Sequence, residues 1–368
     1  MELAEIAKVF QAAPPVLSVY VDAPHVEDVR ERVAVKWKDL RRDLTERGAD
    51  EATLAALAGA VLDPHLEGHG FAGFAGHGQV LWSRRLPEPV PREVALPGPL
   101  PYVLPLLAWR QRRLPYVVVI VDRTGADIYA YSENDVPVDT EKVQGSHDVI
   151  HRVQAGGWSQ LKYQHRAIDS WRGNAAEAAD DIDRAARSVN AELVLVGGDA
   201  NTLHFLRDYL PEALRPKVVV LEHAGARTPG SLSPYLEEEV GDRVADAAKA
   251  GLLAVFEKFE EERGQHDRAA DGLAATVAAL QKAQVATLLV TDDLNDSRTL
   301  SFGPDATLLA TGADDLRALG VESPQEARAA DVLVRAAVGT GADVVVVGPD
   351  DPVTLPEGVG AILRYPDA

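Results

Sequence analysis

Short runs of aliphatic residues recur along the chain, and stretches with helical periodicity separate them. Apolar runs of this kind are typical of strands that are buried within a sheet. We predict strands over residues 16–22, 79–82, 116–122, 126–131, 193–196, 217–221, 287–290 and 344–347. Because strands and helices alternate, the sequence predicts an α/β protein in which helices cover the sheets.

A length of 368 residues suggests two or three domains. We expect three small mixed α/β domains, over residues 1–112, 113–233 and 234–368. Seven prolines lie between residues 86 and 105, which excludes a regular helix or a central strand there. We therefore interpret residues 86–105 as an extended linker.

Helical periodicity supplies the other elements of these domains. Helices are predicted over residues 26–44, 51–62, 174–190, 203–210, 235–263 and 267–283. Five glycines between residues 68 and 78 indicate a mobile loop. The run Ser323-Pro324-Gln325-Glu326 has the pattern of a capping box with proline at the first helical position, so we predict that another helix begins there.

Charge and composition exclude several classes of protein. The formal net charge of −20 opposes nonspecific binding to nucleic acid, and we expect no DNA partner. The chain has no cysteine, which excludes disulfides and thiolate metal sites and fits a reducing cytosol. No stretch approaches the roughly 20 apolar residues that span a bilayer, and the first residues are acidic where a signal peptide is basic. We expect a cytoplasmic protein with no membrane partner.

Residues 145–172 are basic, although the protein as a whole is acidic. Their charged residues give a local charge of +2, from Arg152, Lys162, Arg166 and Arg172 against Asp148 and Asp169. The rings in this segment are Trp158, Tyr163 and Trp171, beside His147, His151 and His165. Gly156 and Gly157 let the backbone approach another surface closely. Cations beside flat rings suit phosphates and bases, so we predict one docking site for RNA.

Two other patterns have plainer explanations than a ligand site. Gly197-Gly198 lies between a predicted strand and a predicted helix, where phosphate can bind. The three spaced glycines of a dinucleotide site and the lysine of a P-loop are absent, so the pair is read as a turn. His65, Glu67, His69 and His77 lie close together in the sequence, but their spacing matches no pair of zinc ligands on a helix. We therefore expect surface histidines.

Aspartates follow several predicted strands. These are Asp122, Asp292, Asp293 and Asp350, and they fall in different predicted domains. Turn formation explains them adequately, and a shared metal is not expected. We expect no cofactor and no bound metal.

The basic segment also carries a recognisable motif. Gly156 and Gly157 are followed by Ser159, Leu161, Lys162 and Tyr163. Residues 122–131 look like an opening hairpin, and residues 360–365 look like a closing motif. On these residues the chain, from about residue 115 to its end, resembles the bacterial branch of the archaeo-eukaryotic peptide-chain release factor family. This family includes the ribosome-rescue protein Pelota and the Balon-type ribosome hibernation factors.

The resemblance implies release-factor-like middle and C-terminal domains at 113–233 and 234–368. Residues 1–112 resemble the decoding domain of the family poorly. Trp158 stands where the family has its catalytic glutamine, which orients the water that cleaves peptidyl-tRNA. An indole has one N–H donor and no acceptor, so it cannot place water in this way, but it can stack on a base.

We therefore expect a hibernation- or rescue-type factor of translation regulation and the stress response, and not an enzyme. It would occupy the ribosomal A site and place residues 156–160 near the peptidyl-transferase centre without peptide release. The expected rRNA-binding residues are Arg152, Gly156, Gly157, Trp158, Ser159, Gln160, Lys162, Tyr163, Arg166 and Arg172. The resemblance also implies a translational GTPase partner such as elongation factor Tu.

Two alternative functions stay open. Gln160 could serve a peptidyl-tRNA hydrolase, if the loop is remodelled to bring it into the place of the missing glutamine. The Gly197-Gly198 turn could instead hold a nucleotide in a metabolic α/β protein.

Overall fold

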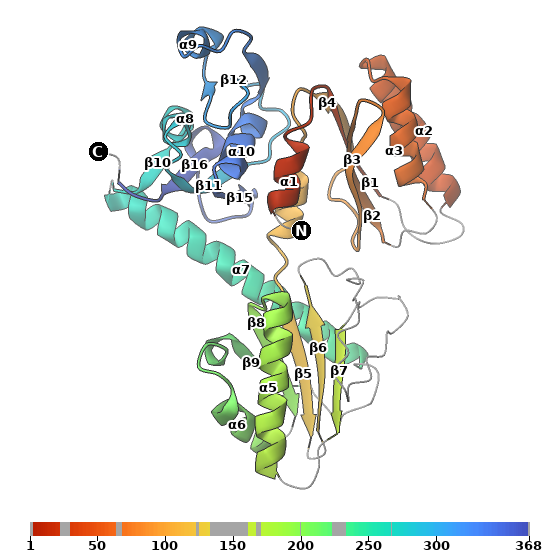
Figure 1. Cartoon of the computed structure of the whole chain (residues 1–368), viewed down its shortest axis with the longest axis vertical. Helices are drawn as coiled ribbons and strands as arrows, with labels where there is room; N and C mark the ends of the chain where they lie inside the picture. Colours follow the sequence, from red (N-terminus) through yellow and green to blue (C-terminus); the bar gives the residue numbers. More distant parts are fainter. Residues whose placement is uncertain are drawn as a thin grey trace. The chain divides into compact units, whose positions relative to one another are not determined.

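The computed structural model describes residues 3–22, 30–63, 68–122, 125–132, 161–166, 171–198, 200–222, 233–265 and 267–366 (Figure 1). The chain forms two compact units. Unit 1 combines Met1–Trp109 with Leu252–Ala368, and unit 2 is Arg110–Gly251. The first and third regions of the sequence thus contribute mainly to one unit, while the division into three domains stays a prediction.

The first sheet of unit 1 is antiparallel, with the strand order β3-β2-β1-β4. Its strands are β1 (Val16–Asp22), β2 (Gly70–Gly76), β3 (Gln79–Leu86) and β4 (Val94–Gly98). The helices around it are α1 (Leu3–Val9), α2 (Arg30–Glu46), α3 (Glu51–Val61) and α4 (Leu104–Arg110). Successive residues of β1 alternate between two cores: Val19 packs under α2 and α3, whereas Tyr20 packs with α1 and α4.

Residues 86–105 are not a linker, which corrects the expectation from the prolines. Residues 94–98 form β4, which pairs with β1. Tyr102, a few residues after β4, is buried. Because β4 is an edge strand, the missing N–H of Pro97 is tolerated there.

Residues 68–78 are not a mobile loop, because β2 is buried along its whole length. Burial on both faces removes the alternation by which a strand is recognised. The glycines fit because their neighbours lie close: a Cβ on Gly70 would lie 2.5 Å from the carbonyl oxygen of Glu88.

The second sheet of unit 1 has the order β10-β16-β11-β15, with β11 parallel to β15 and antiparallel to β16. Its strands are β10 (Ala269–Asp271), β11 (Val285–Thr291), β15 (Asp343–Val347) and β16 (Val359–Leu363). Helices α8 (Leu273–Gln281) and α10 (Ala329–Gly339) pack on one face. The end of α7 (Pro234–Gln265) packs on the other through Phe256 and Phe259.

A three-stranded sheet of order β13-β12-β14 completes unit 1. Its elements are β12 (Thr299–Phe302), β13 (Leu309–Ala310), α9 (Ala313–Ala318) and β14 (Gln325–Arg328). The predicted helix start at Ser323 was therefore wrong, because Gln325–Arg328 pairs with β12. The helix α10 begins at Ala329, whose N–H donates to the carbonyl oxygen of Arg298 at 2.9 Å.

One hydrophobic core joins both large sheets of unit 1. It contains residues of α1 and α4 from the N-terminal part and residues of α8 and α10 from the C-terminal part. Leu104 and Leu106 of α4 and Val332 and Ala336 of α10 are among its fully buried members. Residues far apart in the sequence therefore stabilise a single folded body.

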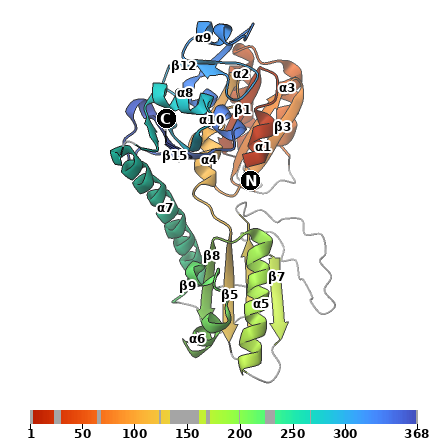
Figure 2. The same cartoon turned by 60° about the vertical axis from the view of Figure 1, so that its left-hand side comes forward.

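The sheet of unit 2 has the order β7-β6-β5-β8-β9, and β5 pairs antiparallel with β6 and parallel with β8 (Figure 1 and Figure 2). Its strands are β5 (Tyr116–Asp122), β6 (Gly125–Tyr131), β7 (Leu161–Arg166), β8 (Leu193–Gly198) and β9 (Val218–Val220). Helices α5 (Trp171–Val189) and α6 (Ala200–Tyr209) cover one face, and the beginning of α7 covers the other. The mixed α/β fold predicted from the sequence is confirmed.

Candidate functional site

The predicted RNA-binding segment leads into β7, an edge strand of the sheet of unit 2. The ladder places Lys162 opposite Tyr129, Tyr163 opposite Ile128 and Arg166 opposite Gly125. An edge strand pairs on one side only within its sheet. The residues that follow Gln160 therefore lie at the border of the sheet rather than at its centre.

The structure brings together only part of the predicted residue set. Lys162, Tyr163 and Arg166 lie in β7, and Arg172 lies in the first turn of α5. The others lie outside the described residues, and their roles stay predictions: Arg152, Gly156, Gly157, Trp158, Ser159 and Gln160.

The neighbouring strand β6 anchors this edge. Ile128 faces the core under α5, whereas Tyr129 and Tyr131 face the core under α7. The rings of Tyr131 and Tyr116 stack with centroids 4.4 Å apart and an angle of 13° between their planes. Asp127, which is 1% exposed, lies opposite Gln164. The strand next to β7 is thus buried on both faces, and Ile128, Tyr129 and Tyr131 are residue types that favour a strand.

Gly197 and Gly198 are the last residues of β8 and pair with β5, so the pair is not the turn that the sequence suggested. Gly198 has a φ of 155°, and a Cβ there would lie 2.4 Å from the carbonyl oxygen of Val121 on the paired strand. Only glycine allows the two backbones to come so close. This close approach accounts for Gly198 without a phosphate ligand.

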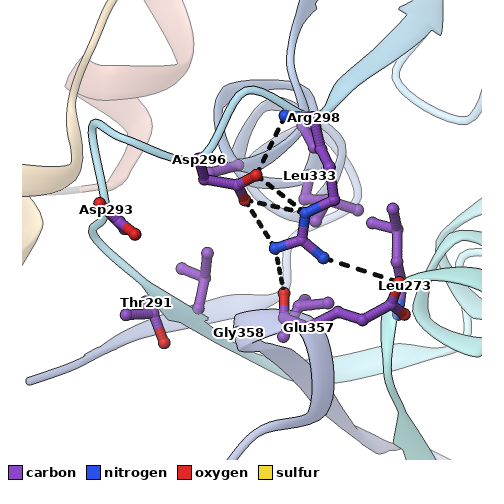
Figure 3. A pocket seen from close by; sticks show the side chains of 12 residues that line it. Leu273, Thr291, Asp293, Asp296, Arg298, Leu333, Glu357 and Gly358 are labelled. Carbon is purple, nitrogen blue, oxygen red and sulfur yellow. Dashed lines mark hydrogen bonds and ion pairs between the residues drawn. The ribbon is translucent and has the colours of Figure 1, made fainter.

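Three polar residues form an ion-paired group where β11 ends (Figure 3). Asp296 accepts hydrogen bonds from Nε and Nη2 of Arg298 at 2.8 and 2.6 Å. Nη2 of Arg298 also donates to the carbonyl oxygen of Glu357 at 2.6 Å. These hydrogen bonds from Arg298 hold the pKa of Asp296 below its usual range.

This group lines a cavity of about 340 Å³ between β11, α8 and α10. Leu273 and Leu333 form part of its apolar wall, and Asp293 lies at its border. Among the described residues that line the cavity, Arg298 is the one cation, and carboxylate and carbonyl partners already engage its guanidinium. The backbone N–H of Asn295 donates to Asp293 at 2.8 Å, which is the turn role expected for that residue.

Asp292 has a partner that the sequence did not reveal. The phenol of Tyr102 donates to Oδ1 and Oδ2 of Asp292 at 2.6 and 2.8 Å. Arg328 lies over the Tyr102 ring, 4.8 Å from its centroid, and Nη1 of Arg328 is 3.6 Å from Oδ2 of Asp331. Burial raises the pKa of Asp331 to about 7, and burial also raises the pKa of Asp292.

Metal-ligating side chains do not gather in the described parts of the chain, where no group of three or more His, Asp or Glu residues could hold an ion. His77 sits in the turn after β2, with Nε2 3.0 Å from the carbonyl oxygen of Ala13. His65 and Glu67 lie outside the described residues. No helix in the described ranges is both long and apolar enough to cross a membrane.

Comparison with known proteins agrees with the resemblance seen in the sequence. Residues 115–265 match the bacterial archaeo-eukaryotic release factor family 2, from the residue before β5 to the last residue of α7. An uncharacterized protein of Mycobacterium tuberculosis, found in two strains, is 34% identical over 363 residues, which are 96% of this chain and 94% of the relative.

Two solved structures are similar to this chain at low identity. Pelota of Archaeoglobus fulgidus is 15% identical, with a TM-score of 0.34, over 80% of this chain and 79% of that chain. Dom34 of S. cerevisiae is 12% identical, with a TM-score of 0.39, over 80% of each chain. Together with the matched range and the relative of nearly equal length, the motif places this chain in the bacterial archaeo-eukaryotic release factor family.

Proposed function

We propose that this protein is a ribosome-associated translation factor that occupies the A site without releasing the nascent peptide. In this proposal, residues 156–160 lie near the peptidyl-transferase centre. The observation that carries the proposal is Trp158 in a basic, aromatic segment, at the position where the family resemblance implies the catalytic glutamine.

The residue chemistry favours occupation over hydrolysis. The indole of Trp158 can stack on a base, which contributes about 1–3 kcal/mol, but it has no acceptor with which to orient water. Gly156 and Gly157 permit a close backbone approach. Arg152, Lys162 and other cations of the segment are suited to rRNA phosphates.

The acidic surface and the basic segment fit one local contact better than general affinity for RNA. A net charge of −20 repels nucleic acid at long range, but charges beyond about 10 Å are largely screened at cellular salt. The segment can therefore bind phosphates locally. The described end of the segment, β7, is an edge strand of its sheet, which suits a contact with a partner.

Cosedimentation of the purified protein with vacant 70S ribosomes tests the proposal directly. The test is run with and without elongation factor Tu, because the family resemblance implies a translational GTPase. We expect a triple variant, Arg152→Ala, Lys162→Ala and Arg166→Ala, to bind more weakly and with a shallower dependence on salt.

A matched control removes two cations elsewhere in unit 2. Arg184 and Arg187 are exposed on α5, where each pairs with an aspartate of the same helix. Arg184→Ala with Arg187→Ala should leave ribosome binding unchanged. Equal weakening in both variants, or no binding by the unaltered protein with elongation factor Tu present, contradicts the proposal.

Release of a labelled nascent peptide separates occupation from hydrolysis. We expect no release above the rate without factor. Release that Gln160→Ala abolishes and Trp158→Ala preserves would instead establish a peptidyl-tRNA hydrolase. Thermal stabilisation by one member of a nucleotide panel, together with indifference to ribosomes, would favour the metabolic alternative.

A further inference from the structure

The junction between the two parts of unit 1 contains a buried polar cluster. Tyr102, from the N-terminal part, donates to Asp292, which follows β11 in the C-terminal part. Tyr20 of β1 in turn donates to the carbonyl oxygen of Tyr102 at 2.7 Å. The ring of Tyr102 also lies against Arg328. Tyr102 thus contacts two charged groups of residues 252–368, and Tyr20 holds the backbone of Tyr102 in place.

Three charged groups of the C-terminal part form the centre of this cluster: the carboxyls of Asp292 and Asp331 and the guanidinium of Arg328. Arg92, from the N-terminal part, and Asp293 also act on Asp292, and their opposite charges offset each other. If both carboxyls are ionised, the cluster has one negative charge in excess. If Asp331 is protonated, the charges balance. Asp331 is 5% exposed, and its Oδ1 is buried without a hydrogen-bond partner among the described residues.

The surroundings of Asp331 contain few other ionisable groups. Arg328 and Asp292 act on it directly, and its charge is felt by Tyr20 and Tyr102. Around Asp292, the further charges are Arg92 and Asp293. The helix α1, which packs against α10, carries Glu5 and the exposed Lys8. The guanidinium of Arg328 therefore faces both carboxyls, and the opposite charges of Arg92 and Asp293 leave this balance unchanged.

We propose that docking of residues 1–109 on residues 252–368 takes up a proton at Asp331. The junction then closes more firmly as pH falls and opens more readily as pH rises. The physical reason is desolvation: the shared core excludes water from a cluster that is neutral when one of its two carboxyls is protonated. Tyr102 donates to Asp292 and favours its ionised form, whereas Oδ1 of Asp331 has no such partner among the described residues, so the proton goes to Asp331.

The direction and the pH window follow from linkage. In the closed junction the pKa of Asp331 is about 7, whereas an aspartate in water has a pKa of about 3.9. Between these values, the closed state holds a proton that the open state releases. The equilibrium constant for opening therefore rises with pH by up to about tenfold per unit, and it levels off above pH 7.

Hydrogen–deuterium exchange on the full chain tests this proposal. Protection is measured from about pH 5 to about pH 8 and corrected for the intrinsic exchange rate at each pH. The reporters are the amides of α1 and α4, which pack in the core of the junction. The reference is α3, which packs on the opposite face of the same sheet. We expect α1 and α4 to lose protection with rising pH relative to α3, by about tenfold or more between pH 5 and pH 7.

Two variants assign the proton. Asp331→Asn removes the titrating group and keeps its size, so the pH dependence of α1 and α4 should disappear. Asp314→Asn, at a carboxyl whose side chain is 95% exposed, should keep it. A pH dependence in Asp331→Asn equal to that of the unaltered protein overturns the proposal. The proposal is also overturned if α3 loses protection to the same extent as α1 and α4. This comparison uses the unaltered protein, so it is valid even if a variant does not fold.

Discussion

The hydroxyl of Tyr102 donates to both carboxylate oxygens of Asp292, at 2.6 and 2.8 Å, across 190 positions of sequence. This hydrogen bond links the segment after β4, in the N-terminal part of unit 1, to the end of β11 in its C-terminal part. It adds a polar contact to the hydrophobic core that joins the two segments, and it can be tested by mutation.

Removal of the Tyr102 hydroxyl should destabilise unit 1. We expect Tyr102→Phe to lower the free energy of unfolding by about 1.5–3 kcal/mol, because a hydrogen bond to a charged acceptor is lost and Asp292 stays partly buried. Urea unfolding measures the change. Tyr235→Phe, at a residue that is 79% exposed, is the control and should stay within about 0.5 kcal/mol of the unaltered protein.

Neutralisation of Asp331 should change how stability depends on pH. Because the folded pKa of Asp331 is raised to about 7, its contribution is most favourable below the unfolded pKa and is lost as pH rises toward 7. The free energy of unfolding of Asp331→Asn, measured relative to that of the unaltered protein, should rise by on the order of 2–4 kcal/mol from pH 4 to pH 8. Parallel stability curves for the two proteins would show that the carboxyl does not titrate in this window.

Two glycines of unit 2 should respond to alanine with opposite signs. Gly198→Ala places a Cβ 2.4 Å from the carbonyl oxygen of Val121, so we expect a loss of about 1–3 kcal/mol. Gly241→Ala, inside α7 with no atom within 4 Å of the added Cβ, should gain up to about 1 kcal/mol from helix propensity. Thermal unfolding of both variants checks the pair, and a stabilised Gly198→Ala would refute the close approach.

Substitution of Trp158 should weaken ribosome binding more when the new side chain has no aromatic ring than when it keeps one. We expect Trp158→Ala to bind about 5- to 150-fold more weakly, which corresponds to a stacking contribution of about 1–3 kcal/mol. Trp158→Phe should retain most of the affinity. Tyr209→Ala, at an aromatic residue of the same unit that is 42% exposed, should have no effect. Binding is measured by cosedimentation at one fixed salt concentration.

Local patterns predicted much of the fold. The apolar runs at β5, β8, β11 and β15 were recognisable because buried strands concentrate branched residues. The long helix α7 followed from its apolar stripe. The motif around Gly156 indicated the family, since residue types at fixed spacing survive where overall identity is low.

The predictions that were wrong share one cause, which is contact between segments that are distant in the sequence. The capping pattern at Ser323 was overridden because Gln325–Arg328 pairs with β12. The glycines of β2 and the prolines before α4 suggested loops, but both stretches are held by β1. Asp292 looked like a turn residue because its partner, Tyr102, lies in a distant part of the chain.

The amino-acid sequence alone determined the α/β class, the basic segment with its indole in place of an amide, and the family. Periodicity and residue chemistry are local properties, and they are readable without coordinates. Tertiary structure decided that the first and last segments share one core, that β7 is an edge strand, and that two carboxyls meet one guanidinium under Tyr102. These features depend on contacts between residues that are distant in sequence, and the desolvation that shifts the pKa of Asp331 exists only when those contacts have formed.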